Sequence, residues 1–101
     1  MKSLPILYIV VPCYNEEESL PIFYHAVCDV AQTLPDYQMT FLLINDGSKD
    51  NTLQIMRDLA AKDERVKYLS FSRNFGKEAA MYAGFCNAEG DYVAVMDADM
   101  Q

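Results

Sequence analysis

Apolar and polar positions alternate in blocks along this chain of 101 residues. Runs rich in apolar residues predict strands at 6–11, 40–44, 66–71 and 92–96. The runs at 6–11, 40–44 and 92–96 are typical of buried strands. Between them, apolar side chains recur at helical spacing, which predicts helices over residues 17–34, 52–62 and 76–87. Strict alternation of strand and helix predicts parallel strands with right-handed crossovers. We therefore expect an α/β, Rossmann-like fold whose mostly parallel sheet carries helices on both faces.

Two local features refine this picture. Proline has no N–H to donate to a strand ladder, so Pro12 is expected to end the first strand. Small residues in the third helix, among them Gly84, would let that helix pack close to the sheet.

The last apolar run stops a few residues before the chain does, which is unusual for a natural domain end. We therefore expect residues 1–101 to be part of a longer domain that is truncated at its C-terminal end.

Composition narrows the possible partners. Fifteen acidic and eight basic residues give a net charge of −7, which disfavours nucleic acids and anionic membrane surfaces. A hydrophobic fraction of 51% argues against disorder. The three cysteines lack metal-type spacing and are interpreted as reduced thiols. No segment approaches the roughly 18 apolar residues of a membrane span, so we expect residues 1–101 to be soluble.

A polar segment follows each predicted strand, at residues 12–16, 45–50, 72–77 and 97–99. Parallel strands place their carboxyl ends along one edge of the sheet, where open α/β sheets bind ligands. The segments together supply an aromatic ring, carboxylates, glycines and two cations. This inventory suits a nucleoside diphosphate with a metal ion. The ring would cover the base, and Arg73 and Lys77, which flank Gly76 at a helix start, would meet phosphate.

Asp97 and Asp99 point to the metal. Two carboxylates one residue apart repel each other, and burying them is costly unless they share a positive charge. Hard oxygen ligands at this spacing suit Mg²⁺ or Mn²⁺, with phosphate oxygens completing the shell. The alternative interpretation is a solvated acidic loop.

Other candidates also have structural interpretations. Residues 45–48 make a good turn, in which Ser48, or Asp50 after it, would only cap the second helix. Tyr14 could be an ordinary core residue. Asn15 and Glu16 could simply be residues at the start of a helix. Arg73 and Lys77 could be surface charges.

With these motifs in this order, the chain resembles the N-terminal half of a family 2 inverting glycosyltransferase, which has the GT-A fold. Val10–Glu17 resembles the family's opening V-P-x-Y-N-E. Residues 45–52 resemble its D-D-G-S-x-D-x-T, with asparagine in place of the first aspartate. Asp97-Ala98-Asp99 resembles its D-x-D. Residues 72–80 and 97–101 are similar to the branch that loads sugars onto polyprenyl phosphates, which includes dolichyl-phosphate mannosyltransferases and bactoprenol glucosyltransferases.

The resemblance implies roles for matching residues. Asp46 would contact the base, and Arg73 and Lys77 would lie near the base and the diphosphate. Asp97 would approach the ribose or the metal, and Asp99 would be a metal ligand. The asparagine at position 45 puts one base or ribose contact in doubt. The resulting candidates are Pro12, Tyr14, Asn15, Glu16, Asp46, Ser48, Arg73, Lys77 and Asp97 for substrate, and Asp97, Asp99 and Gln101 for metal.

The implied reaction transfers a hexose, with inversion, from a UDP-glucose- or GDP-mannose-type donor to a polyprenyl phosphate. The family's later acidic residue and its acceptor elements lie beyond Gln101, so we expect residues 1–101 to be inactive alone and name no catalytic residue. The full-length protein would work at the cytoplasmic face of a membrane, attached through segments beyond this chain. Homo-oligomers are possible because an exposed last strand could drive self-association.

Two other functions remain open. One is a nucleotide-binding regulatory module without transfer chemistry. The other is a metal-dependent α/β phosphohydrolase with an aspartyl nucleophile. That chemistry usually places its D-x-D after the first strand, whereas here the motif follows the fourth.

Overall fold

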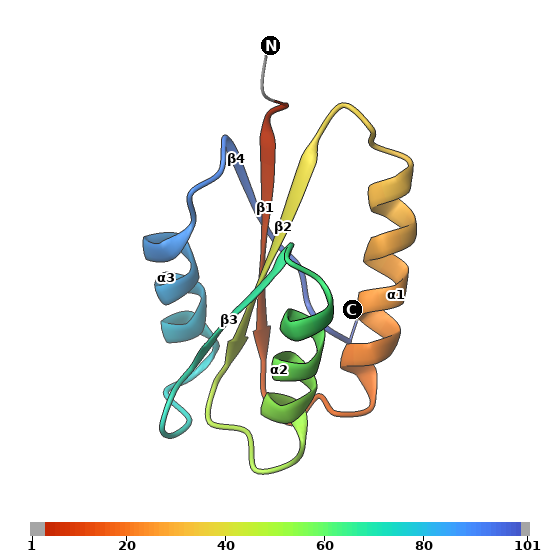
Figure 1. Ribbon diagram of the computed structural model, residues 1–101. Coiled ribbons are helices and arrows are strands. Elements are labelled where there is room, and N and C mark those ends of the chain that lie inside the picture. The colour runs from red at the N-terminus through yellow and green to blue at the C-terminus, as the bar shows by residue number, and fades with distance from the viewer. Residues whose placement is uncertain (1–3, 100–101) are drawn as a thin grey trace.

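The computed structural model describes residues 4–99, in which strands and helices alternate along the chain (Figure 1). The elements are β1 Ile6–Cys13, α1 Ser19–Gln32, β2 Gln38–Asn45, α2 Thr52–Lys62, β3 Val66–Ser70, α3 Lys77–Asn87 and β4 Tyr92–Val95. The strands form one parallel sheet in the order β3-β2-β1-β4, which confirms the predicted α/β fold. None of the helices in this part of the chain is both long and apolar enough to cross a membrane.

Helices cover both faces of the sheet, as predicted (Figure 1). On one face, Phe23 of α1 and Met56 of α2 pack with Val11 of β1 in a buried cluster. On the other face, Ala80 of α3 packs with Val10 of β1. Neighbouring side chains of β1 therefore pack on opposite faces of the sheet, because successive side chains of a strand point to opposite faces. Residues of β1 and β2 therefore contribute to the cores on both faces of the sheet.

The small residues of α3 allow its close approach to the sheet, as the sequence predicted. Ala80 is fully buried against the sheet. A Cβ added at Gly84 would lie 2.3 Å from Cγ1 of Val10, closer than real atoms come. A larger residue at position 84 would push α3 outward and move its N-terminus.

Pro12 does not end the first strand, contrary to expectation: β1 continues to Cys13, still paired with β2. The carbonyl of Cys13 accepts from the N–H of Asp46 on the β2 side, and the carbonyl of Val10 accepts from Met96 on the β4 side. Pro12, two residues from Val10, faces the β4 side as well, because backbone groups alternate along a strand. The β4 ladder reaches only to Val10, so the missing N–H leaves no ladder bond unmade.

The prediction that the last strand is buried on both faces is wrong. Tyr92 at its start is 58% exposed, and Val93 is exposed too. Within residues 4–99, β4 pairs with β1 and no further strand, so it forms an edge of the sheet. Only its later part, Ala94 and Val95, packs against the two cores. The apolar run therefore predicted the position of the strand correctly but overestimated its burial.

Candidate functional site

A cleft of about 520 Å³ lies at the carboxyl ends of β1 and β4, and all four predicted polar segments contribute to it. Its walls are Pro12, Cys13, Tyr14, Glu16, Asp46, Asn74, Gly76, Lys77, Asp97, Ala98 and Asp99. Six of the predicted substrate residues and both predicted aspartate metal ligands are therefore brought together. Asn15, Ser48 and Arg73 do not line this cleft. Gln101, the third predicted metal ligand, lies outside the described residues.

Lys77 and Asp97 form an ion pair across the cleft. Nζ of Lys77 lies 2.7 Å from Oδ1 of Asp97, and the lysine side chain is 59% exposed. The hydrogen bond with Asp97 and its negative charge raise the pKa of Lys77 above its usual range. Lys77 is the first residue of α3, so its charge adds to the partial positive charge of a helix N-terminus. The positive charge of Lys77 therefore lies beside Asp97 in the cleft, where it could neutralise the phosphates of a bound ligand.

Asp46, at the end of β2, binds the segment that starts α3. Its Oδ1 accepts a hydrogen bond from the backbone N–H of Phe75 at 2.8 Å, and its Oδ2 accepts one from Gly76 at 3.0 Å. Nδ2 of Asn74 donates to Oδ2 at 3.2 Å. The residue is only 3% exposed although it borders the cleft. The predicted contact between Asp46 and a base stays a prediction.

Gly47 lets the same two segments meet. Its φ of +71° is a conformation that glycine adopts without strain. A Cβ there would lie 2.2 Å from the carbonyl carbon of Arg73 and 2.3 Å from the nitrogen of Asn74. The glycine after Asp46 is therefore required by backbone contact as well as by the turn.

Asn15 and Ser48 join two loops rather than facing the cleft. The N–H of Asn15 donates to Oγ of Ser48 at 2.9 Å, and Oδ1 of Asn15 accepts from the N–H of Lys49 at 2.8 Å. Asn15 has a φ of +54°, a left-handed conformation that asparagine tolerates better than most residues. The structure thus gives both side chains a structural role, while their predicted substrate contacts stay predictions.

The loop after β1 and the loop after β2 are also joined by hydrogen bonds at the start of α2. Oγ1 of Thr52 accepts from the N–H of Glu16 at 2.8 Å. The carboxylate of Asp50 accepts from the N–H of Thr52 at 2.9 Å and from Glu17 at 3.3 Å. Desolvation alone would raise the pKa of Asp50, but the hydrogen bonds from Thr52 and Glu17 lower it overall. Asp50 therefore binds the first N–H of α2, as the structural interpretation of the motif expected.

Arg73 lies on a second cavity, of about 520 Å³, beside the ends of β2 and β3. Its guanidinium carbon is 4.7 Å from the ring centroid of Phe75, a cation–π contact. Tyr14 borders both cavities. Although Arg73 and Lys77 flank Gly76 in the sequence, Lys77 lines the cleft and Arg73 lines the second cavity.

Asn45 is a buried internal link, which the sequence did not reveal. Its Nδ2 donates to Oγ of Ser70 in β3 at 3.0 Å, and its Oδ1 accepts from the N–H of Ser48 at 3.0 Å. The amide therefore joins two strand ends and closes the turn after β2. Asn74 is the other residue that sequence reasoning missed, although its place in the third polar segment was a usable signal.

The acid pair offers an incomplete metal site. Carboxylate oxygens of Asp97 and Asp99 are the hard ligands that Mg²⁺ and Mn²⁺ prefer, so the donor set fits such an ion. Within residues 4–99, no group of three or more histidine, cysteine, aspartate or glutamate residues could hold a metal by itself. Phosphate oxygens of a bound ligand would therefore have to complete the shell.

The family model described as "Glycosyl transferase family 2" matches residues 8–101. The chain belongs to this family. It is 50% identical over 93 residues to the bactoprenol glucosyl transferase of Shigella phage SfV, covering 92% of this chain and 30% of that protein. It is 41% identical over 104 residues to the undecaprenyl-phosphate 4-deoxy-4-formamido-L-arabinose transferase of Pseudomonas fluorescens, covering 100% and 30%. The chain thus spans about a third of the length of the curated relatives it matches.

Solved structures of glycosyltransferases share the fold. The mannosyltransferase of Pyrobaculum calidifontis, in complex with GDP-Man and Mn²⁺, superposes with a TM-score of 0.80 at 20% identity, over 96% of this chain and 28% of that one. S. aureus TarS in complex with UDP gives a TM-score of 0.76 at 25% identity, over 92% and 27%. The structural similarity therefore supports the GT-A type of α/β fold.

Proposed function

We propose that this chain forms the donor-binding part of a glycosyltransferase that moves a hexose from a nucleoside diphosphate sugar to a polyprenyl phosphate with inversion. One observation carries the proposal: four polar segments converge on one cleft, where Lys77 stands beside Asp97 and Asp99. Family membership supports the transfer chemistry, and the names of the bactoprenol and undecaprenyl-phosphate relatives support the lipid acceptor.

The residues divide the work of binding the donor. Lys77 and the N-terminus of α3 attract the diphosphate, because both present positive charge at one wall of the cleft. Tyr14 supplies an aromatic face for the base, and Pro12 and Glu16 line the cleft beside it. Arg73, which borders the second cavity together with Tyr14, would contact the base end of the nucleotide rather than its phosphates.

Asp97 and Asp99 would hold Mg²⁺ or Mn²⁺ together with the phosphates. Such an ion supplies charge neutralisation for the nucleotide as it leaves. The chain has a net charge of −7 and the donor adds further negative charge, so a cation at the cleft would favour donor binding. A phosphate acceptor carries its own nucleophilic oxygen, so its attack needs little base assistance. We assign no catalytic base to this chain, and we expect residues 1–101 to bind a donor but to transfer nothing alone.

The acceptor also bears on where the protein works. A polyprenyl phosphate is a membrane lipid, so the reaction takes place at a membrane surface, and we propose its cytoplasmic face. Contact with the bilayer would come from segments outside this chain. The exposed edge at β4 is the surface through which we propose self-association.

Calorimetric titration of the full-length protein with UDP-glucose and GDP-mannose, with and without Mn²⁺, tests donor binding. We expect one of the two to bind, and Mn²⁺ to strengthen that binding. Absence of binding by both, with Mn²⁺ present, would overturn the proposal. Transfer of labelled sugar to polyprenyl phosphate then separates the enzyme from a regulatory nucleotide-binding module, which would bind without transfer.

A further inference from the structure

Tyr14 borders both the cleft and the second cavity with an exposed side chain. The residue is 42% exposed, and its side chain makes no hydrogen bond or ring contact with any other described residue. A tyrosine side chain has only two rotatable bonds, so the main chain largely decides where the ring points. The position of the Tyr14 ring therefore depends on the residues immediately before and after it.

The main chain before Tyr14 is fixed by the sheet. Cys13 is the last residue of β1, pairs with Asn45 of β2 and is only 1% exposed. Its carbonyl accepts a hydrogen bond from the N–H of Asp46 at 2.9 Å. Because β1 ends at Cys13, the sheet does not determine the direction that the chain takes after Tyr14. That direction depends on Asn15.

Asn15 is held by the loop after β2 through both its backbone and its side chain. Its N–H donates to Oγ of Ser48 at 2.9 Å, and its Oδ1 accepts from the N–H of Lys49 at 2.8 Å. Its φ of +54° turns the chain in a way that most residues with a Cβ resist. We call these two hydrogen bonds the Asn15 clasp.

The clasp is attached in turn to the buried end of β2. The N–H of Ser48 donates to Oδ1 of Asn45 at 3.0 Å. Asn45 is 3% exposed, and its Nδ2 donates to Oγ of Ser70 in β3 at 3.0 Å. Hydrogen bonds thus connect two strands of the sheet, through Ser48, to the residue that follows Tyr14. Removing the Ser48 hydroxyl would break this connection next to the Tyr14 ring.

We propose that Asn15 and Ser48 are positioning residues that hold the Tyr14 ring against the base of a bound nucleotide, and that they act on binding through Tyr14. This assignment rests on the proposed function, because it presumes a nucleotide whose base meets Tyr14. It differs from the direct substrate contacts that the sequence predicted for both residues. A direct contact would be lost whether or not Tyr14 is present, so the two roles can be distinguished.

The first test compares ligands that have a base with one that has none. Ser48→Ala removes the acceptor for the N–H of Asn15, so the Tyr14 ring has to become ordered when the base binds. In the full-length protein, we expect binding of uridine or guanosine, whichever the wild type prefers, to weaken about fivefold, the cost of immobilising one side chain. Binding of inorganic pyrophosphate with Mn²⁺ should change less than about twofold. An equal loss for pyrophosphate would show general damage to the cleft and overturn the proposal.

Conservative replacements separate the two parts of the clasp. Ser48→Thr keeps the hydroxyl and should bind the nucleoside within about twofold of the wild type. Asn15→Gly keeps access to a positive φ but loses Oδ1, whereas Asn15→Ala loses both, so the alanine variant should show the larger loss. Wild-type nucleoside binding by Asn15→Ala would contradict the proposal.

A double-mutant cycle tests whether the effect passes through Tyr14. In a Tyr14→Ala background, Ser48→Ala should weaken binding of UDP or GDP by less than about twofold. Independent, multiplying losses would assign Ser48 a substrate contact of its own and overturn the proposal. Thr33→Ala is the matched control, since it also removes a hydroxyl that bonds a backbone group, here the carbonyl of Val30 at 2.6 Å near the end of α1. It should leave nucleotide binding unchanged in both backgrounds.

Hydrogen exchange gives a readout that needs no ligand. In Ser48→Ala, the amides of Asn15 and Lys49 should exchange faster than in the wild type, whereas Ser48→Thr and Thr33→Ala should leave both unchanged. Unchanged exchange in Ser48→Ala would refute the positioning role. If the wild type bound neither UDP nor GDP, the proposed function would fail, whereas wild-type nucleoside binding by Ser48→Ala would refute the positioning role alone.

Discussion

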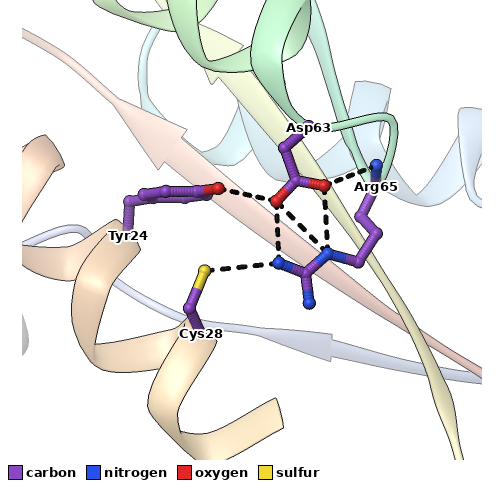
Figure 2. Close-up of polar contacts among 4 residues, drawn as sticks. All are labelled: Tyr24, Cys28, Asp63 and Arg65. Carbon is purple, nitrogen blue, oxygen red and sulfur yellow. Dashed lines mark hydrogen bonds and ion pairs between the residues drawn. The ribbon is translucent and has the colours of Figure 1, made fainter. Parts of the chain in front are cut away.

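Two carboxylate–cation pairs at different parts of the molecule show what separates a structural site from a binding site. In the first, Asp63 accepts hydrogen bonds from Nε and Nη2 of Arg65 and from the hydroxyl of Tyr24, at 2.6–3.2 Å (Figure 2). In the second, Nζ of Lys77 lies 2.7 Å from Oδ1 of Asp97 in an open cleft. The first carboxylate is saturated by protein groups, whereas the second pair faces space for a ligand.

The Asp63 cluster is formed by Tyr24, Cys28, Asp63 and Arg65, whose side chains bond to one another (Figure 2). Nη2 of Arg65 reaches Sγ of Cys28 at 3.4 Å, and its guanidinium lies 5.5 Å from the ring centroid of Phe41. The hydrogen bonds from Arg65 lower the pKa of Asp63 well below its usual range, and the hydrogen bond to Asp63 raises that of Tyr24. A perturbed pKa is therefore not sufficient to mark a candidate site in this protein, and we base the candidate site on the open cleft instead.

The largest effect should come from the acid pair. Asp99→Asn would remove the charge of a proposed metal ligand, so UDP or GDP binding in Mn²⁺ should weaken about 100-fold. Calorimetry measures the loss. Asp58→Asn, on the exposed face of α2, is the control and should bind as the wild type does. A metal-independent loss of equal size would show that Asp99 acts on the nucleotide directly.

Breaking the Asp63 cluster should affect stability and not binding. Asp63→Ala leaves Arg65 and the hydroxyl of Tyr24 without their acceptor, and we expect a loss of about 2 kcal/mol in the free energy of unfolding. Denaturant titration measures it, with Asp36→Ala as a control on an exposed loop. A change in nucleotide affinity of more than a few-fold would contradict the separation of the two regions.

Lys77→Met should have the opposite profile. Diphosphate binding should fall about tenfold, whereas the unfolding midpoint should stay unchanged because the side chain is largely exposed. Without nucleotide, Mn²⁺ affinity should rise, since Asp97 loses a competing cation. Lys67→Met, on β3, serves as the exposed-lysine control. Loss of stability in Lys77→Met would make this ion pair structural like that of Asp63.

Acid titration should give the smallest difference. Because the folded pKa of Asp63 is lowered, its stabilising contribution is fully present above the unfolded value, about 3.9, and is lost as pH falls through the folded value. The stability gap between wild type and Asp63→Asn should thus be constant near neutral pH and narrow below about pH 4. Thermal melts at several pH values measure it. A gap that widened in acid would contradict the sign of this shift.

Sequence reasoning correctly predicted the alternation of elements, the parallel sheet and the convergence of most of the site. Periodicity and breakers act locally, and crossover chirality brings every strand's carboxyl end to one edge. Pro12, Tyr14, Lys77 and Asp97 could therefore be placed together before any coordinates. The helix at 17–34 was two residues too long at each end, because the 3.6-residue pattern continues past the last helical hydrogen bonds.

Only the tertiary structure determined which side chains face the cleft and which form hydrogen bonds to other parts of the protein. Asn15 and Ser48 bind each other's loops across 33 residues of sequence, and Tyr24 meets Asp63 across 39. The exposure of β4 likewise depends on what lies beside it and not on its own composition. A hydrogen-bond partner is set by which loops become adjacent on folding, and the pattern of apolar positions along a single segment carries no record of that.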